Sequence, residues 1–226
     1  CQYELTDAPT WTIDPIDGTT NFVHRLSLTA VLIAFLVDRQ PVVGVIYDPM
    51  ADEMFYAMQG QGAFLQRQTS TISDAIAIAT TIPTPPPQRL QVSGTTSLTQ
   101  AVVTMDAGYG RSAAAVDRYT TVQRAILLLR VRHVRVLGCC GLTMAYLAAG
   151  RVDACLEEGS WERNTGPKIW DLAAGKLLIQ EAGGVTRDLT GRLAKDNKPL
   201  DLMQRSLFAA ASVELANVLV DIINAA

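Results

Sequence analysis

Residues 11–24 read WTIDPIDGTTNFVH, and this stretch carries the densest chemistry in the 226-residue chain. Hydrophobic and β-branched residues lead up to Asp14, which predicts a strand that ends there, and the proline after it keeps Asp14 extended. Asp17 follows three residues later, and Gly18 frees the backbone to turn so that both carboxylates face one side. With the carbonyl of Ile16 between them, the spacing predicts three converging oxygen donors.

Oxygen donors of this kind suit a hard divalent cation such as Mg²⁺. Directly downstream, Thr19, Thr20 and Asn21 are predicted to form the first turn of a helix, whose free N–H groups and positive dipole end favour a phosphate. The alternative is structural: Asp17 caps the helix and Asp14 belongs to a turn, as in most Asp-Gly and Asp-Pro pairs. The motif predicts adjoining metal and phosphate sites, with the capping role left open.

The rest of the chain divides into two parts with different patterns. Residues 28–37, 42–47 and 54–57 are β-rich, the first two joined by a polar turn at 38–41, whereas 66–75 is predicted to be a loop or bulged edge. A short strand at 76–79 and a proline-rich segment at 83–87 follow. Beyond it strands alternate with helices, the strands at 101–105, 134–137, 152–156 and 207–211 and the helices at 113–129, 142–149, 171–182 and 213–225. This order predicts a layered α+β sandwich with a metal- and phosphate-binding lobe at 1–82 and an α/β lobe at 83–226.

Composition narrows the class of protein. With 49% apolar and 18% charged residues the chain is globular, and a net charge of -3 leaves no basic footprint for nucleic acid or a membrane surface. The four cysteines, Cys1, Cys139, Cys140 and Cys155, form no zinc motif and are interpreted as reduced intracellular thiols. No apolar run approaches the ~20 residues of a membrane span. We expect a soluble, cytoplasmic protein.

The string from Asp14 to His24 resembles the first signature of the inositol monophosphatase family. A second anchor, WDLAAG at 170–175 followed by EAGGV at 181–185, resembles the family's second signature. The resemblance covers nearly the whole chain and implies the family's αβαβα sandwich of the sugar-phosphatase type. It also implies that Asp171 opens a helix and supplies another metal carboxylate, a position that the helix dipole favours for an acid. A simple helix cap is the alternative.

Further substrate contacts follow from the resemblance. Gly138, Cys139 and Cys140 align with the family's small-residue loop that touches the substrate, where Ser or Thr and Ala are usual. The paired cysteines are interpreted as small residues packed close to a ligand, with a reactive thiol at a helix N-terminus as the alternative. Glu157 falls where the family places a carboxylate that binds sugar hydroxyls, the alternative being a solvated strand end. The insert at 160–169 either alters substrate choice or is a surface extension.

Part of the family's pattern is not found in this sequence. Members have a Gly-Glu-Glu segment upstream of the first signature, and its Glu binds metal and helps to activate the attacking water. Only thirteen residues precede Asp14 here, and Glu4 among them lacks that context. The leading helices that cover one face of the sheet are missing too. We therefore expect an N-terminally truncated member that lacks the first helical layer and the upstream strand.

The resemblance implies a Mg²⁺-dependent, lithium-sensitive phosphomonoesterase in which metal-activated water attacks a small polyol phosphate, with myo-inositol 1-phosphate first. Thr19 and Asp17 are the implied catalytic residues. The implied metal ligands are Asp14, the Ile16 carbonyl, Asp17 and Asp171. The implied substrate contacts are Ile16, Asp17, Gly18, Thr19, Gly138, Cys139, Cys140, Glu157 and Asp171. A homodimer is expected from the resemblance alone, and the alternatives are a related sugar or nucleotide phosphatase and a non-catalytic fragment or pseudoenzyme.

Overall fold

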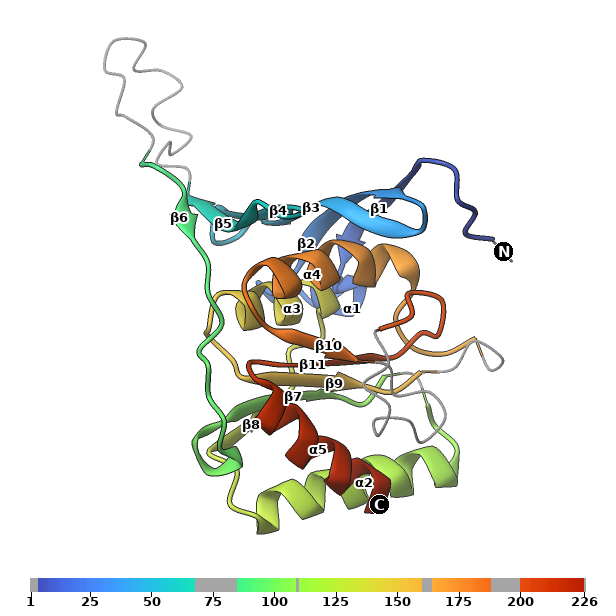
Figure 1. Ribbon diagram of the computed structural model, residues 1–226. Helices are drawn as coiled ribbons and strands as arrows, with labels where there is room; N and C mark the ends of the chain where they lie inside the picture. The colour runs from blue at the N-terminus through green and yellow to red at the C-terminus, as the bar shows by residue number, and fades with distance from the viewer. Residues whose placement is uncertain (1–3, 68–84, 109, 160–163, 188–199, 226) are drawn as a thin grey trace.

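Two β-sheets and two helical layers make up the described part of the chain. The structure, a computed structural model, describes residues 4–67, 85–108, 110–159, 164–187 and 200–225. A six-stranded sheet is followed by helices α3 (Cys140–Ala148) and α4 (Ile169–Glu181), then by a five-stranded sheet, and finally by helices α2 (Ala113–Leu128) and α5 (Val213–Ala225) (Figure 1). The predicted layered sandwich is confirmed. Among the described residues, no helix covers the outer face of the six-stranded sheet (Figure 1).

The first sheet is antiparallel throughout, and its strands lie in chain order. They are β1 (Thr10–Asp17), β2 (Ala30–Val37), β3 (Gln40–Asp48), β4 (Glu53–Met58), β5 (Gly62–Arg67) and β6 (Gln88–Arg89). The turn is shorter in the structure than the predicted range 38–41. Asp38 and Arg39 alone form it, with φ of 48° and 62°. Positive φ at both central residues matches the twist of a two-residue hairpin.

The prediction for the far side of this sheet was partly wrong. Strand β5 includes Gln66 and Arg67, which were assigned to a loop or bulged edge, because its Ala63 and Leu65 are buried on the core face while the polar residues lie at the strand's end. The predicted strand at 76–79 lies outside the described residues. So does the boundary between the two predicted lobes at 82/83, which stays a prediction.

The second sheet is mixed, with the order β10–β11–β9–β7–β8. Its strands are β7 (Val102–Asp106), β8 (His133–Arg135), β9 (Ala154–Glu157), β10 (Val185–Arg187) and β11 (Leu207–Ala210). Strand β10 was not predicted. Because β7 and β9 are parallel and Asp106 pairs with Glu157 in their register, these two acidic residues end their strands at the same edge.

Close packing fixes α4 against the first sheet. A Cβ added to Gly44 on β3 would lie 2.9 Å from the carbonyl oxygen of Ala174, so β3 and α4 approach too closely for a side chain there. Most of α4 is buried between the sheets, including Leu172 and Leu178. The start of α4, which carries Asp171, is therefore held near the first sheet. None of the described helices has the length and apolar character to cross a membrane.

Candidate functional site

Strand β1 carries both carboxylates of the first motif and bends between them. Pairing with β2 runs to Asp14, breaks, and resumes where Asp17 lies opposite Ala30. The predicted strand end at Asp14 is therefore wrong. Proline has no N–H to give to the ladder, so the pairing breaks at Pro15 while the chain stays extended. The side chain of Asp14 closes the bulge by accepting a hydrogen bond from the Ile16 amide at 3.0 Å.

The turn after Asp17 depends on Gly18. This residue has a φ of 75°, and an added Cβ would lie 2.7 Å from the Leu28 carbonyl oxygen. Helix α1 (Thr19–Val23) begins directly after it, as predicted, but is only five residues long. The Thr19 hydroxyl donates to the Ile16 carbonyl at 3.1 Å. The backbone thus folds back on itself, with Thr19 and the Ile16 carbonyl in contact.

The structure brings the three predicted metal carboxylates together. One oxygen each from Asp14, Asp17 and Asp171 lies within 4.8 Å of the other two. Asp17 is buried, whereas Asp14 and Asp171 are half-buried. Two of these residues come from β1 and the third from the first turn of α4, 154 positions further along the chain than Asp17. We call these three residues the carboxylate cluster.

Hydrogen bonds hold two members of the carboxylate cluster in place. Asp17 accepts from the amide of Gly18 at 2.8 Å, from the amide of Gly141 at 2.6 Å and from the thiol of Cys139 at 3.0 Å. Asp171 accepts from the Lys168 amide at 2.6 Å and so caps the start of α4. The capping alternative for Asp171 is thus present together with its place in the cluster.

The cluster is electrostatically strained without a cation. Burial raises the pKa of Asp17, and the nearby Asp14 charge adds to it, although the hydrogen bonds to Asp17 oppose the shift. Burial also raises the pKa of Asp171 to about 8, helped by a hydrogen bond with Asp14 and by the charges of Asp17 and Asp14. These directions mean that the folded protein disfavours three negative charges here, which a bound cation would offset.

Both cysteines at the start of α3 belong to this neighbourhood. Cys139 is buried and caps the helix, and burial together with the Asp17 carboxylate raises the pKa of its thiol well above the ordinary value. Burial and the nearby acidic groups do the same for Cys140. The reactive-thiol alternative is therefore disfavoured at both positions, because reactivity requires the thiolate.

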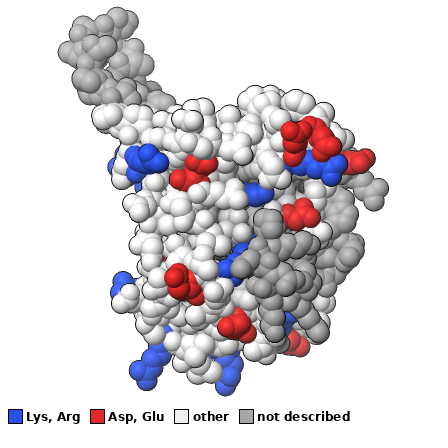
Figure 2. Space-filling view, in the orientation of Figure 1, with Lys and Arg blue, Asp and Glu red and all other residues white. Residues whose placement is uncertain are grey.

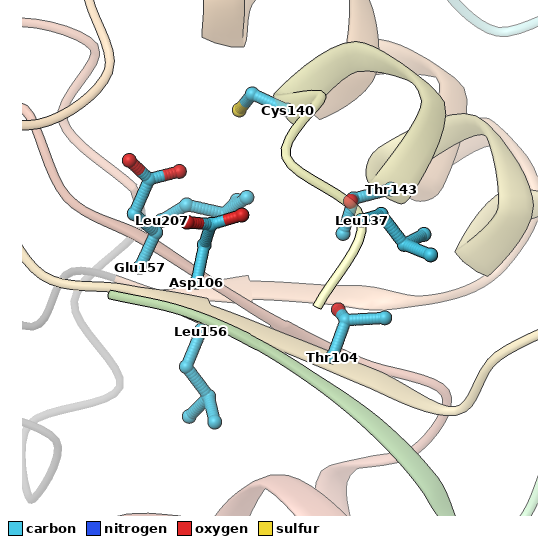
Figure 3. A pocket seen from close by; sticks show the side chains of 8 residues that line it. All are labelled: Thr104, Asp106, Leu137, Cys140, Thr143, Leu156, Glu157 and Leu207. Atoms are coloured by element: carbon cyan, nitrogen blue, oxygen red, sulfur yellow. The ribbon is translucent and has the colours of Figure 1, made fainter. Parts of the chain in front are cut away.

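A cavity lies beside the cluster, lined by side chains from the second sheet, from the loop before α3 and from α3 itself (Figure 3). Its lining residues are Thr104, Asp106, Leu137, Cys140, Thr143, Leu156, Glu157 and Leu207. Burial raises the pKa of Glu157 to about 8, and the charges of Asp106, Asp171 and Asp17 contribute in that order. Glu157 is half-buried in this cavity, which disagrees with the alternative that it is a solvated strand end.

Asp106, Thr104 and Thr143 line the cavity but were not predicted from the sequence. Asp106 had a usable signal, because it directly follows a predicted strand just as Glu157 does. It accepts a hydrogen bond from the Gly138 amide at 3.0 Å. Gly138 has a φ of 68°, and its carbonyl accepts from the side chain of Asn21 at 3.2 Å.

The remaining sequence predictions have mixed outcomes. Residues 160–163 of the predicted insert lie outside the described residues, so its effect on substrate choice stays a prediction. His133 is exposed, as expected for a residue in a basic surface run, whereas His24, expected to pack or hydrogen-bond within its helix, is exposed too. On the face shown in Figure 2, basic and acidic side chains are interspersed and no large basic patch gathers.

Comparisons with known proteins agree with this geometry. A family model described as the inositol monophosphatase family matches residues 1–225. Inositol monophosphatase 2 of Solanum lycopersicum is 36% identical over 222 residues, which cover 98% of this chain and 71% of that protein. Inositol monophosphatase 2 of Homo sapiens is 36% identical over 212 residues, covering 94% and 62%. A solved structure of an IMPase from Thermotoga maritima superposes with a TM-score of 0.73 at 27% identity, covering 99% of this chain and 71% of that one.

A match over 225 residues, a shared fold and a carboxylate cluster built from both signatures agree with one another. The chain therefore belongs to the inositol monophosphatase family, whose named members are phosphoric monoester hydrolases.

Proposed function

We propose that this protein is a Mg²⁺-dependent phosphatase that hydrolyses a small polyol phosphate monoester, with myo-inositol 1-phosphate as the first candidate. The observation that carries the proposal is the convergence of Asp14, Asp17 and Asp171 within 4.8 Å beside a cavity that contains further acceptors. The names of the relatives, inositol monophosphatase in plant and human, support the substrate class.

The residues present fit a hard cation. Asp14, Asp17 and Asp171 supply carboxylate oxygens and Ile16 a carbonyl, and the raised pKa of Asp171 indicates negative charge in need of compensation. A bound Mg²⁺ would supply Lewis-acid stabilisation of phosphoryl oxygens and lower the pKa of a coordinated water.

The chain's own groups orient the reactants. Asp17 is fixed by three donors, so its carboxylate is preorganised rather than free to rotate. The Thr19 hydroxyl donates to the Ile16 carbonyl and can still accept a hydrogen bond, which allows it to hold the attacking water. We assign the backbone amide of Thr19 to the phosphoryl oxygens, whereas the Gly18 amide, expected to bind them too, already donates to Asp17 at 2.8 Å. On the leaving-group side, Glu157 accepts hydroxyl hydrogens, and Cys140 borders the same space.

The test is phosphate release from myo-inositol 1-phosphate, fructose 1,6-bisphosphate and adenosine 3′,5′-bisphosphate, with Mg²⁺, with a chelator, and with added Li⁺. We expect the inositol ester to be preferred, with activity lost in chelator and inhibited by Li⁺. Preference for one of the other esters would assign the protein to a related sugar or nucleotide phosphatase.

Calorimetric titration with Mg²⁺ separates an enzyme from a non-catalytic relative. Asp14→Asn and Asp171→Asn should each weaken saturable binding, whereas Asp38→Asn, the same charge change in an exposed turn, should not. Binding unaffected by the first two substitutions, or phosphate release insensitive to Mg²⁺ removal, would refute the proposal. The proposal includes a cytoplasmic homodimer, which sedimentation of the purified protein and imaging of a tagged copy test.

A further inference from the structure

The cavity beside the cluster contains a second acidic residue next to Glu157. Asp106 ends β7, Glu157 ends β9, and the two are direct partners in the parallel register. Figure 3 shows both carboxylates on the same side of the sheet, directed toward Cys140. The carboxyl ends of parallel strands are a common place for ligands in α/β folds. The pair is therefore placed where a ligand would meet both acids.

Asp106 is positioned by the loop before α3. One of its carboxylate oxygens accepts from the Gly138 amide at 3.0 Å, which fixes the direction of the side chain. Within the described residues, its other oxygen accepts no hydrogen bond. Asp106 is also the first neighbouring charge, after burial itself, that raises the pKa of Glu157. Asp106 thus acts on the same small space as Glu157 and has a free acceptor to offer there.

The loop places this acidic pair next to the carboxylate cluster. Cys140 lines the cavity, while its two neighbours, Cys139 and Gly141, both donate hydrogen bonds to Asp17. With its phosphate at the cluster, an ester would place its alcohol part past Cys140, at the mouth of this small cavity. Hydroxyl groups there would donate to carboxyl oxygens, whereas a second phosphate would add negative charge beside Asp106, in a space that already disfavours a charge on Glu157.

We propose that Asp106 is a specificity-determining residue: with Glu157, it binds the hydroxyls of a neutral polyol leaving group and excludes esters that carry a second phosphate in the cavity. This inference rests on the function proposed above and deepens it. It predicts that the protein acts on polyol monophosphates in preference to polyol bisphosphates.

The substitution Asp106→Asn removes the Asp106 charge and keeps the shape of the side chain. An asparagine oxygen still accepts from the Gly138 amide, so the loop keeps its anchor while the negative charge is removed. Two negative charges about 8 Å apart, in a medium between protein and water, repel each other. When one of them is a phosphate dianion, this repulsion changes the affinity for the ester roughly tenfold. We therefore expect about a tenfold change in discrimination.

The experiment compares kcat/KM for myo-inositol 1-phosphate and myo-inositol 1,4-bisphosphate, and dissociation constants for their non-hydrolysable phosphonate counterparts. In Asp106→Asn the bisphosphate-to-monophosphate ratio should rise about tenfold by both measures. Asp117→Asn, the same charge change on the exposed face of α2, should leave the ratio unaltered. If Asp106→Asn folds poorly in thermal melting, Asp106→Ser removes the same charge and keeps an acceptor.

The outcomes separate the two proposals. An unaltered ratio in Asp106→Asn, or a wild-type protein that accepts both esters equally, overturns the role of Asp106 and leaves the phosphatase proposal standing. A protein that releases no phosphate overturns the proposed function, while the phosphonate dissociation constants still decide whether Asp106 discriminates. A raised ratio in the Asp117→Asn control would also overturn the inference, because it would assign the effect to overall charge.

Discussion

The thiol of Cys139 is expected to position a metal ligand, and Cys139→Ala tests this. Its sulfur donates to Asp17 at 3.0 Å and is one of three donors to that carboxylate. A hydrogen bond to a charged acceptor contributes about 1.5–3 kcal/mol, and a thiol is a weak donor, so we take about 1 kcal/mol. Because 1.4 kcal/mol is about a factor of ten in an equilibrium constant, Mg²⁺ should bind Cys139→Ala roughly fivefold more weakly.

The assay is a Mg²⁺ titration by calorimetry of the wild type, Cys139→Ala and Cys139→Ser at one pH. Serine restores a donor, so Cys139→Ser should recover most of the lost affinity. Cys155→Ala is the matched control, because Cys155 is equally buried but lies on β9, where no hydrogen bond from its thiol to Asp17 exists among the described residues. Thermal melting separates a general loss of stability from the local effect.

The positioning role of the Cys139 thiol would be refuted if Cys139→Ala bound Mg²⁺ as tightly as the wild type. It would also be refuted if Cys139→Ala and Cys155→Ala weakened binding equally, since the loss would then follow from core truncation. A weakening confined to position 139 and reversed by serine would assign the effect to the hydrogen bond. Serine at this position would also match the family's usual residue.

Three further predictions concern stability and backbone. First, the pKa values of Asp171 and Glu157 in the folded protein, about 8, lie above their ordinary values of 3.8 and 4.5, so the folded state keeps protons that the unfolded state loses. In urea unfolding with chelator, the wild type should therefore lose stability relative to Asp171→Asn between pH 5 and about 8. A gain in relative stability over this range would contradict the prediction. Second, Gly44→Val should destabilise the fold by more than about 1 kcal/mol in urea unfolding, because Ala174 leaves no room for a side chain; an unaltered midpoint would count against the close packing of α4. Third, Gly18→Ala should reduce Mg²⁺ affinity in calorimetry at least severalfold, since φ of 75° and a 2.7 Å approach both oppose a Cβ; wild-type affinity would show that the turn tolerates displacement.

Local chemistry determined how much of this protein could be predicted from its sequence. The Asp14–Asp17 spacing and Gly18 act within four residues of one another, so the converging carboxylates and the positive φ were both foreseeable. The continuation of β1 past Asp14 was not, because it depends on pairing with β2 rather than on the residues of β1. Asp171 was assigned through resemblance, since no periodicity connects α4 to β1.

Two contacts of the site that sequence reasoning missed join distant segments. The thiol of Cys139 and the carboxylate of Asp17 are 122 positions apart, and the Asp106 side chain meets the Gly138 amide across 32 positions. Propensity and spacing contain no information on such contacts, because they arise when the two sheets pack against the middle helices. The paired cysteines were identified as a departure from the family, but their partner became evident only in the fold.

The loop from Gly138 to Gly141 connects the two halves of the proposed reaction. Its first amide holds Asp106 on the leaving-group side, while its last amide and the Cys139 thiol hold Asp17 in the carboxylate cluster. A rigid loop that contacts both sides fixes their separation, so an ester must match the distance between phosphate and hydroxyl acceptors to occupy both. Substitutions in this loop should therefore alter metal affinity and substrate discrimination together, whereas Asp106→Asn, which keeps the loop's anchor, should alter discrimination alone.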